Sequence, residues 1–204
     1  MRYIDNKALS IIAAIFTLTA CSPQSTSMSG ISFPEDAKIA EALQTQLKND
    51  PNSATARELV RTLGGEKGSL KFLIKDVIYR QGAYEVHYDA ALVMGQAGTD
   101  SLKALYAGMV PEADRTRLTP DTRETYEAWL KNQAETLQKD PARKAAGDAL
   151  ASTVELLNQC YQDAKPGAEI PVMQGLGALL SPARSGLYAE KLPRADITVR
   201  CLPM

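Results

Sequence analysis

The sequence predicts a helix-dominated α+β domain with a small antiparallel sheet. Three observations favour this fold class: apolar residues recur at helical spacing in several stretches, two neighbouring stretches have the character of a β-hairpin, and the last residues alternate again. A lone hairpin is marginally stable in water. We therefore expect a hairpin over about 71–93, a C-terminal strand over about 196–202 as its third strand, and helices packed on one face of this sheet.

Two helices are expected before the hairpin. Pro34 suits the first position of a helix, and the next proline, Pro51, ends it. Between them, apolar residues repeat every four positions, which is the spacing of an amphipathic helix; they are Ile39, Leu43 and Leu47. A shorter helix follows, capped by Ser53 and ended by the glycine pair that starts at Gly64.

The hairpin is the clearest element of the sequence. Residues 70–79 are rich in β-branched and aromatic side chains, and Gln81-Gly82 supplies a turn. Apolar and polar residues then alternate, as in a strand with one buried face; the apolar ones are Tyr84, Val86, Tyr88, Ala90 and Leu92.

Further helices are expected between residues 101 and 161. Prolines mark their limits, because proline tends to end one helix and to begin the next; they are Pro111, Pro120 and Pro141. The chain is less regular after this. Residues 172–180 are apolar but interrupted by glycine, which leaves a loop or a short helix, and residues 182–188 are expected to form an exposed loop.

The first residues of the chain have the pattern of an export signal. Arg2 and Lys7 precede an apolar stretch over residues 8–20. A helix over this stretch would rise only about 20 Å, well short of the roughly 30 Å hydrocarbon core of a bilayer. Residues 1–20 are therefore predicted to be a signal peptide rather than a membrane span.

The end of this stretch, Leu18-Thr19-Ala20-Cys21, resembles the lipobox of bacterial lipoproteins. The resemblance implies export, cleavage before Cys21 and acylation of that cysteine, which would anchor the chain in a lipid bilayer. Ser22 stands where enteric lipoproteins retained in the inner membrane carry Asp, so the resemblance implies the outer membrane, on its periplasmic face. Residues 21–30 would be the lipidated cysteine and a flexible Ser-rich tether, and residues 31–204 a periplasmic α+β domain.

If Cys21 carries lipid, two cysteines remain, Cys160 and Cys201. An oxidising periplasm permits a disulfide between them, and such a bridge would hold the C-terminal residues that otherwise fray. The alternative is two separate buried thiols.

Composition excludes several functions. The chain of 204 residues has 23 basic and 24 acidic residues, which argues against a nucleic-acid partner because such proteins carry a basic surplus. Its 45% hydrophobic and 23% charged residues are typical of a globular domain rather than a disordered one. A single His excludes a multi-histidine metal site. No phosphate-binding loop, dinucleotide motif or nucleophile elbow occurs, so no cofactor and no catalytic residue are assigned.

Two groups of residues are candidate sites. Glu85, His87 and Asp89 alternate along a strand and so share a face, where they form a weak candidate for a metal site; a solvated polar face is the alternative. In the expected loop over 182–188, a further set suits a partner-binding surface, because Arg and Tyr are enriched at interface hot spots. This set is Arg184, Ser185, Gly186 and Tyr188.

Two functions remain open. We expect a membrane-anchored periplasmic lipoprotein that binds another protein, either as an assembly factor of envelope or secretion machinery or as an immunity or inhibitor protein. The alternative is a cell-envelope hydrolase, because carboxylates can pair in three dimensions without leaving a trace in the sequence.

Overall fold

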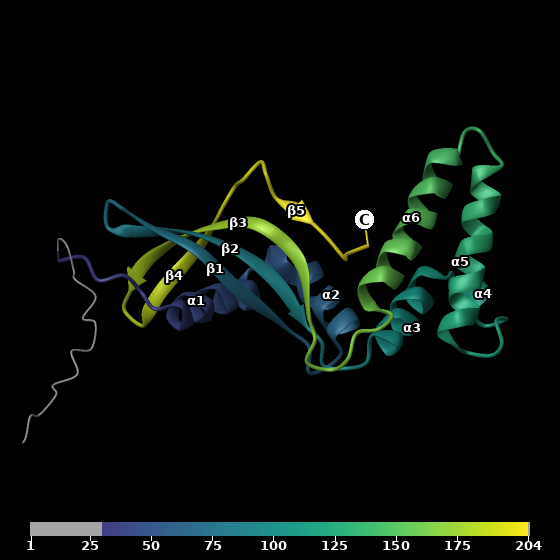
Figure 1. Ribbon diagram of the computed structural model, residues 1–204, viewed down its shortest axis with the longest axis horizontal. Coiled ribbons are helices and arrows are strands. Elements are labelled where there is room, and N and C mark those ends of the chain that lie inside the picture. The colour runs from purple at the N-terminus through teal and green to yellow at the C-terminus, as the bar shows by residue number, and fades with distance from the viewer. Residues whose placement is uncertain (1–29, 204) are drawn as a thin grey trace, which may run out of the picture. The chain divides into compact units, whose positions relative to one another are not determined.

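The computed structural model describes residues 30–203, and a single compact unit begins at Phe33 (Figure 1). The predicted signal peptide over residues 1–20, Cys21 and the tether up to residue 29 lie outside the described residues. Within the described range, every helix is too short or too polar to cross a bilayer.

The described part of the chain contains six α-helices and a five-stranded antiparallel sheet, so the predicted α+β class is confirmed. The helices are α1 (Asp36–Asn49), α2 (Ala54–Gly64), α3 (Gly98–Met109), α4 (Glu112–Arg115), α5 (Arg123–Gln138) and α6 (Lys144–Tyr161). The strands are β1 (Ser69–Arg80), β2 (Ala83–Val93), β3 (Glu169–Ala183), β4 (Gly186–Leu192) and β5 (Thr198–Val199).

The predicted hairpin is formed by β1 and β2. The two strands pair from Arg80 opposite Ala83 to Ser69 opposite Val93, with one register shift between Ile74 and Asp76. The order of the main strands is β1-β2-β3-β4, and β5 pairs with β3. The turn at Gln81-Gly82 has positive φ at both residues, of 51° and 92°, which suits the twist of a tight hairpin.

The third strand differs from the prediction. Residues 172–180 lie in β3, which pairs with β2, and are neither a loop nor a short helix. The C-terminal strand exists as β5 but pairs with β3 rather than with the hairpin. The glycine that suggested an interruption marks an irregularity within the strand: Gly175 has a φ of +76° and lies where the register with β2 shifts.

The expected loop over 182–188 is also different. Its ends belong to β3 and β4, and only Arg184-Ser185 form the turn between these strands. Proline in a strand is normally a sign against that assignment. Pro182 is tolerated because it lies opposite Leu187, one pair away from the pair that closes the turn. Residues at that position form no backbone hydrogen bonds between β3 and β4, so the missing N–H costs none.

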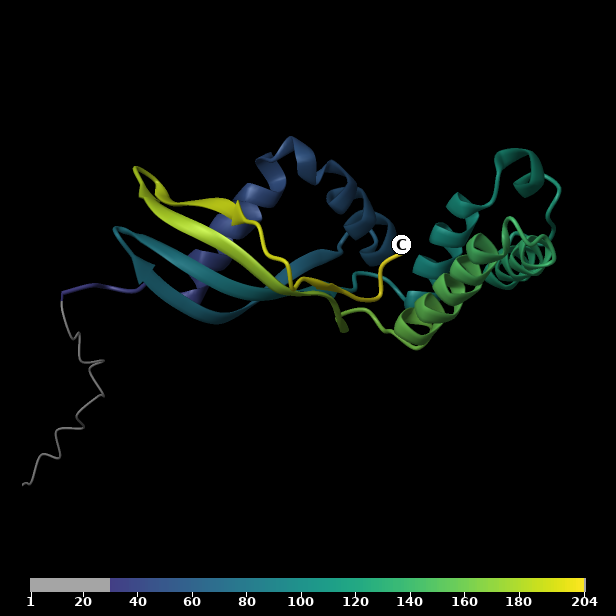
Figure 2. The ribbon, with the colours of Figure 1, turned by 90° about the horizontal axis from the view of Figure 1, so that it is seen from above.

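Helices α1 and α2 lie over the same face of the sheet (Figure 2). The core beneath α1 joins apolar residues of this helix to residues of three strands, and its most buried members are Ile39, Leu43, Val86, Ala178 and Leu180. Packing of one helical stripe on one sheet face is what the amphipathic pattern of α1 predicts.

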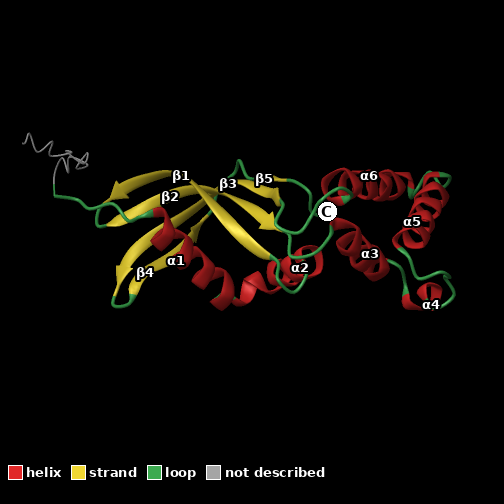
Figure 3. Cartoon of the chain, turned by 60° about the horizontal axis from the view of Figure 1, so that its bottom comes forward, coloured by secondary structure: helices red, strands yellow, loops and turns green. Residues whose placement is uncertain are grey.

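A second core includes helices α3, α5 and α6, which are inserted between β2 and β3 (Figure 3). Tyr106 is fully buried there, and its hydroxyl donates to the Val154 carbonyl at 3.2 Å. The predicted disulfide between Cys160 and Cys201 is confirmed, with a Cα–Cα distance of 5.7 Å. Next to it, the hydroxyl of Tyr161 donates to the Cys201 carbonyl at 2.7 Å, so α6 holds the end of the chain.

Candidate functional site

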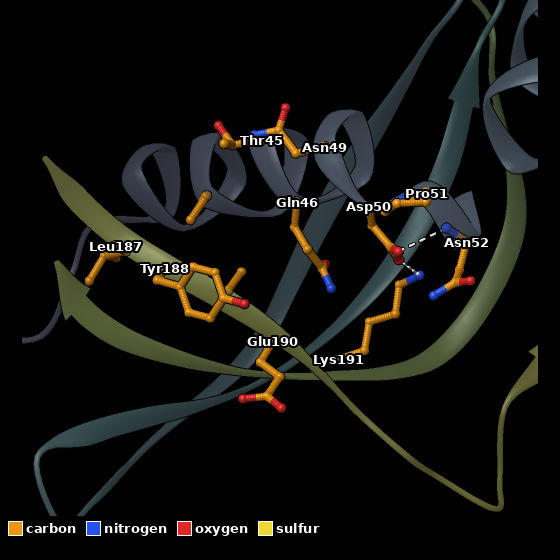
Figure 4. A pocket seen from close by; sticks show the side chains of 12 residues that line it. Thr45, Gln46, Asn49, Asp50, Pro51, Asn52, Leu187, Tyr188, Glu190 and Lys191 are labelled. Atoms are coloured by element: carbon orange, nitrogen blue, oxygen red, sulfur yellow. Dashed lines mark hydrogen bonds and ion pairs between the residues drawn. The ribbon is translucent and has the colours of Figure 1, made fainter. Parts of the chain in front are cut away.

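A groove of about 520 Å³ runs between the C-terminal half of α1 and strand β4 (Figure 4). We call it the α1/β4 groove. Helix α1 contributes polar side chains to it, Thr45, Gln46 and Asn49, and β4 contributes five consecutive residues, 187–191. The groove is therefore polar on the helix side and is bordered by strand backbone on the other.

The border formed by β4 is an open sheet edge. In an antiparallel pair, alternate residues exchange backbone hydrogen bonds with the neighbouring strand, and the residues between them direct their N–H and C=O groups the other way. A two-residue turn joins β3 to β4, so the pair that closes it, Ala183 and Gly186, is hydrogen-bonded, and the next pair, Pro182 and Leu187, is not. By the same alternation, Ala189 and Lys191 also direct their backbone groups away from β3. Among the described residues, β3 is the only strand that pairs with β4.

One end of the groove is closed by a polar cluster around Asp50. Its carboxylate accepts hydrogen bonds from Lys191 Nζ at 2.7 Å, from the Asn52 N–H at 2.9 Å and from Ser53 Oγ at 3.0 Å. Figure 4 shows the Asp50 and Lys191 side chains pointing toward one another. The hydrogen bond from Lys191, and then the one from Asn52, lower the pKa of Asp50 to about 2, so this carboxylate is ionised at neutral pH.

The carboxylates of the groove do not have the arrangement that a hydrolase needs. A general acid requires a carboxyl group whose pKa lies near the working pH, whereas Asp50 is held in its ionised form by Lys191. The other acidic side chain, Glu190, is exposed, and Figure 4 shows its carboxylate turned away from Asp50. The groove is better suited to binding a polar chain than to proton transfer.

The predicted partner-binding residues are only partly brought together. Tyr188 lines the groove and is 64% exposed, an unusual position for a large aromatic side chain. Arg184 and Ser185 are exposed in the turn before β4, Gly186 is exposed as the first residue of β4, and none of the three lines the groove.

The predicted metal candidates lie on β2 and make other contacts. His87 Nε2 is 2.9 Å from Glu85 Oε1, and Glu85 is also paired with Arg80. Asp89 instead accepts from the Gly175 N–H at 3.0 Å and pairs with Lys75. Over residues 30–203, no three side chains of His, Cys, Asp or Glu come together in a way that could hold a metal ion.

Sequence reasoning missed most of the groove. The polar residues of α1 were visible only as the outer face of an amphipathic helix, and the pairing of Asp50 with Lys191 joins positions 141 residues apart. The one available signal was the exposed Arg–Tyr segment near β4.

Comparison with known proteins finds no matching family model, no matching curated protein and no matching solved structure.

Proposed function

We propose that the protein is a lipoprotein, anchored by acylated Cys21 on the periplasmic face of the outer membrane, that binds another protein through the α1/β4 groove. The open edge of β4, which directs the backbone groups of Leu187, Ala189 and Lys191 away from β3, carries the proposal. The lipobox-like sequence before Cys21 supports the anchor.

The expected binding mode is addition of a strand. An extended segment of the partner lies beside β4 and pairs with its outward N–H and C=O groups, while pockets and exposed side chains along the edge provide specificity. Thr45, Gln46 and Asn49 of α1 face the other side of that segment. Exposed sheet edges are normally protected against such pairing, so an edge that opens on a groove is consistent with a binding role in an assembly factor or an immunity protein.

Tyr188 is the side chain expected to contribute most to affinity, because tyrosine is enriched at interface hot spots. Its replacement in Tyr188→Ala should weaken partner binding by about 2 kcal/mol, roughly 30-fold. Folding should be almost unaffected, because the side chain is 64% exposed. The measurement is photo-crosslinking in cells from a benzoylphenylalanine placed at Asn49, a groove position.

The matched control is Tyr79→Ala, which removes another exposed tyrosine, one that does not line the groove. We expect a distinct crosslinked partner that is lost with Tyr188→Ala and retained with Tyr79→Ala. Equal crosslinking in both variants, or none in the parent protein, would show that the groove does not bind a partner.

The anchor is tested separately in the same cells. Cys21→Ala should abolish labelling by radioactive palmitate and remove the protein from the outer-membrane fraction. Continued labelling would contradict the anchor while leaving the groove hypothesis to the crosslinking result.

A further inference from the structure

A second cavity, of about 280 Å³, lies between helices α1 and α2 and the sheet. Its lining is almost entirely apolar. The apolar side chains that line it include Leu70, Phe72, Met173, Leu176 and Ile197. Two of its residues, Gln46 and Lys191, also line the α1/β4 groove, so the two spaces meet there. We call this space the apolar cavity.

The apolar cavity leaves side chains incompletely packed. Protein interiors normally contain few voids larger than a water molecule. Leu70, Phe72, Met173 and Leu176 are only partly buried although they line the space beneath α1 and α2, and Ile197 is 37% exposed. These apolar surfaces would gain free energy if a ligand covered them.

One polar group in the cavity has no partner. Tyr88 lines the apolar cavity and is only 6% exposed, yet its hydroxyl makes no hydrogen bond to any of the described residues 30–203. Burial raises the pKa of Tyr88 to about 12, so the group is a neutral hydroxyl that can donate a hydrogen bond at neutral pH. Within residues 30–203, the one fully buried side-chain N or O atom without a hydrogen-bond partner is Nη1 of Arg123, so the Tyr88 hydroxyl keeps some accessible surface. Through that surface it can donate to an acceptor on a ligand.

The mouth of the cavity disfavours a negatively charged group. Lys191 is already neutralised by Asp50 at 2.7 Å and also donates to Ser53 at 3.0 Å. The side chain of Glu190 adds a further negative charge to the adjoining groove. A neutral polar group, in contrast, could form hydrogen bonds with the amide of Gln46.

We propose that the apolar cavity binds a single acyl chain presented as a neutral ester or amide. The acyl carbonyl accepts a hydrogen bond from the Tyr88 hydroxyl, the hydrocarbon chain covers Leu70 and Met173, and the polar head lies at Gln46 where the groove begins. A water molecule takes up roughly 30 Å³ in the liquid, and a methylene group is of similar size. The apolar cavity, of about 280 Å³, therefore has room for about nine methylene groups.

A smaller cavity extends the same path. It has a volume of about 60 Å³, an apolar lining, and shares Ala56, Leu70 and Met173 with the apolar cavity. Polarity therefore decreases from the groove through the apolar cavity to this smaller cavity, in the order that an amphipathic ligand requires.

The test is calorimetric titration of the segment 22–204, exported so that its disulfide forms. This segment keeps the compact unit that begins at Phe33, which holds every described helix and strand. It also lacks Cys21 and hence any lipid of its own. The probes, used below their micelle-forming concentrations, are 1-decanoylglycerol, the corresponding decyl ether, which lacks the carbonyl, and decanoate.

We expect 1-decanoylglycerol to bind at least tenfold more tightly than decanoate, because the mouth disfavours a carboxylate. Tyr88→Phe should weaken binding of the ester about tenfold, the equivalent of one buried hydrogen bond, and should leave binding of the ether unchanged. Tyr79→Phe, which removes the hydroxyl of an exposed tyrosine that lines neither the groove nor the apolar cavity, is the matched control and should change neither.

A second variant fills the space. Ala56→Leu places a larger side chain where both cavities meet and should reduce binding of the ester at least tenfold without lowering the melting temperature. The proposal is overturned if 1-decanoylglycerol does not bind, if decanoate binds as tightly, or if both Tyr88→Phe and Ala56→Leu bind the ester like the parent protein. None of these readouts depends on the partner protein or on Cys21.

Discussion

At the scale of single residues, Asp50 has the most connected position in the groove. It follows the last turn of α1 and accepts hydrogen bonds from Asn52, Ser53 and Lys191, so one carboxylate joins the helix, the turn after it and β4. Charge-assisted hydrogen bonds of this kind are stronger than neutral ones. Asp50 therefore holds the two walls of the groove together at one end.

The pKa of Asp50 predicts how this link depends on pH. The folded-state pKa of about 2 lies below the ordinary value of 3.8, so the stabilisation is complete above about pH 4 and is lost as pH falls toward 2. In Asp50→Asn, the melting temperature should therefore fall less steeply between pH 4 and 2 than in the parent protein. Asn49→Ala, which changes an uncharged side chain of the groove, is the control and should keep the slope of the parent curve. Parallel curves for Asp50→Asn and the parent would contradict the prediction.

At the scale of elements, α3 and α6 meet at a contact that only glycine permits. The Gly98 N–H donates to the Ala164 carbonyl at 2.9 Å. A Cβ at Gly98 would lie 1.8 Å from the carbonyl oxygen of Tyr161, far inside van der Waals contact. The start of α3 is thus fixed against the end of α6 through backbone rather than through side chains.

The contact predicts opposite effects of one substitution at two glycines of the same helix. Gly98→Ala should lower the free energy of unfolding by about 3 kcal/mol or more, because helix α6 backbone must move. Gly108→Ala meets no atom within 4 Å and should raise it by about 0.5–1 kcal/mol, because alanine has the higher helix propensity. Urea unfolding of both variants measures the difference, and a similar loss in the two would refute the close contact at Gly98.

At the scale of the whole unit, the two cores are continuous. Phe72 and Leu176 pack against both of them, and β2 runs from Tyr88 in the core beneath α1 to Leu92 in the core of the inserted helices. Elements that share buried side chains in this way are expected to unfold together.

This continuity predicts one cooperative unfolding transition, and the chain contains two natural probes for it. It has a single His, in the sheet at His87, and a single Trp, in α5 at Trp129. The imidazole NMR signal and the indole fluorescence should therefore give the same urea midpoint, measured on the segment 22–204. Separate midpoints would mean that the inserted helices unfold independently of the sheet.

Much of the fold was predictable from short-range patterns. The spacing of Ile39 and Leu43 predicted α1, the alternation around Val86 predicted β2, and the two cysteines left over after Cys21 predicted the disulfide. The prediction failed for β3 because Gly175 and Pro182 are local signs against a strand, and only pairing on both sides of β3 overrides them. Acylation of Cys21 stays a prediction, because that residue lies outside the described part of the chain.

The sequence by itself determined the fold class, most helices, the first hairpin and the disulfide partners, because each depends on neighbouring residues or on a small set of cysteines. Only the tertiary structure decided which strand lies beside β2, that β4 keeps an open edge, and that Asp50 and Tyr88 line adjoining spaces. These features depend on contacts between residues far apart in the chain, such as Asp50 and Lys191, and no local pattern encodes such contacts.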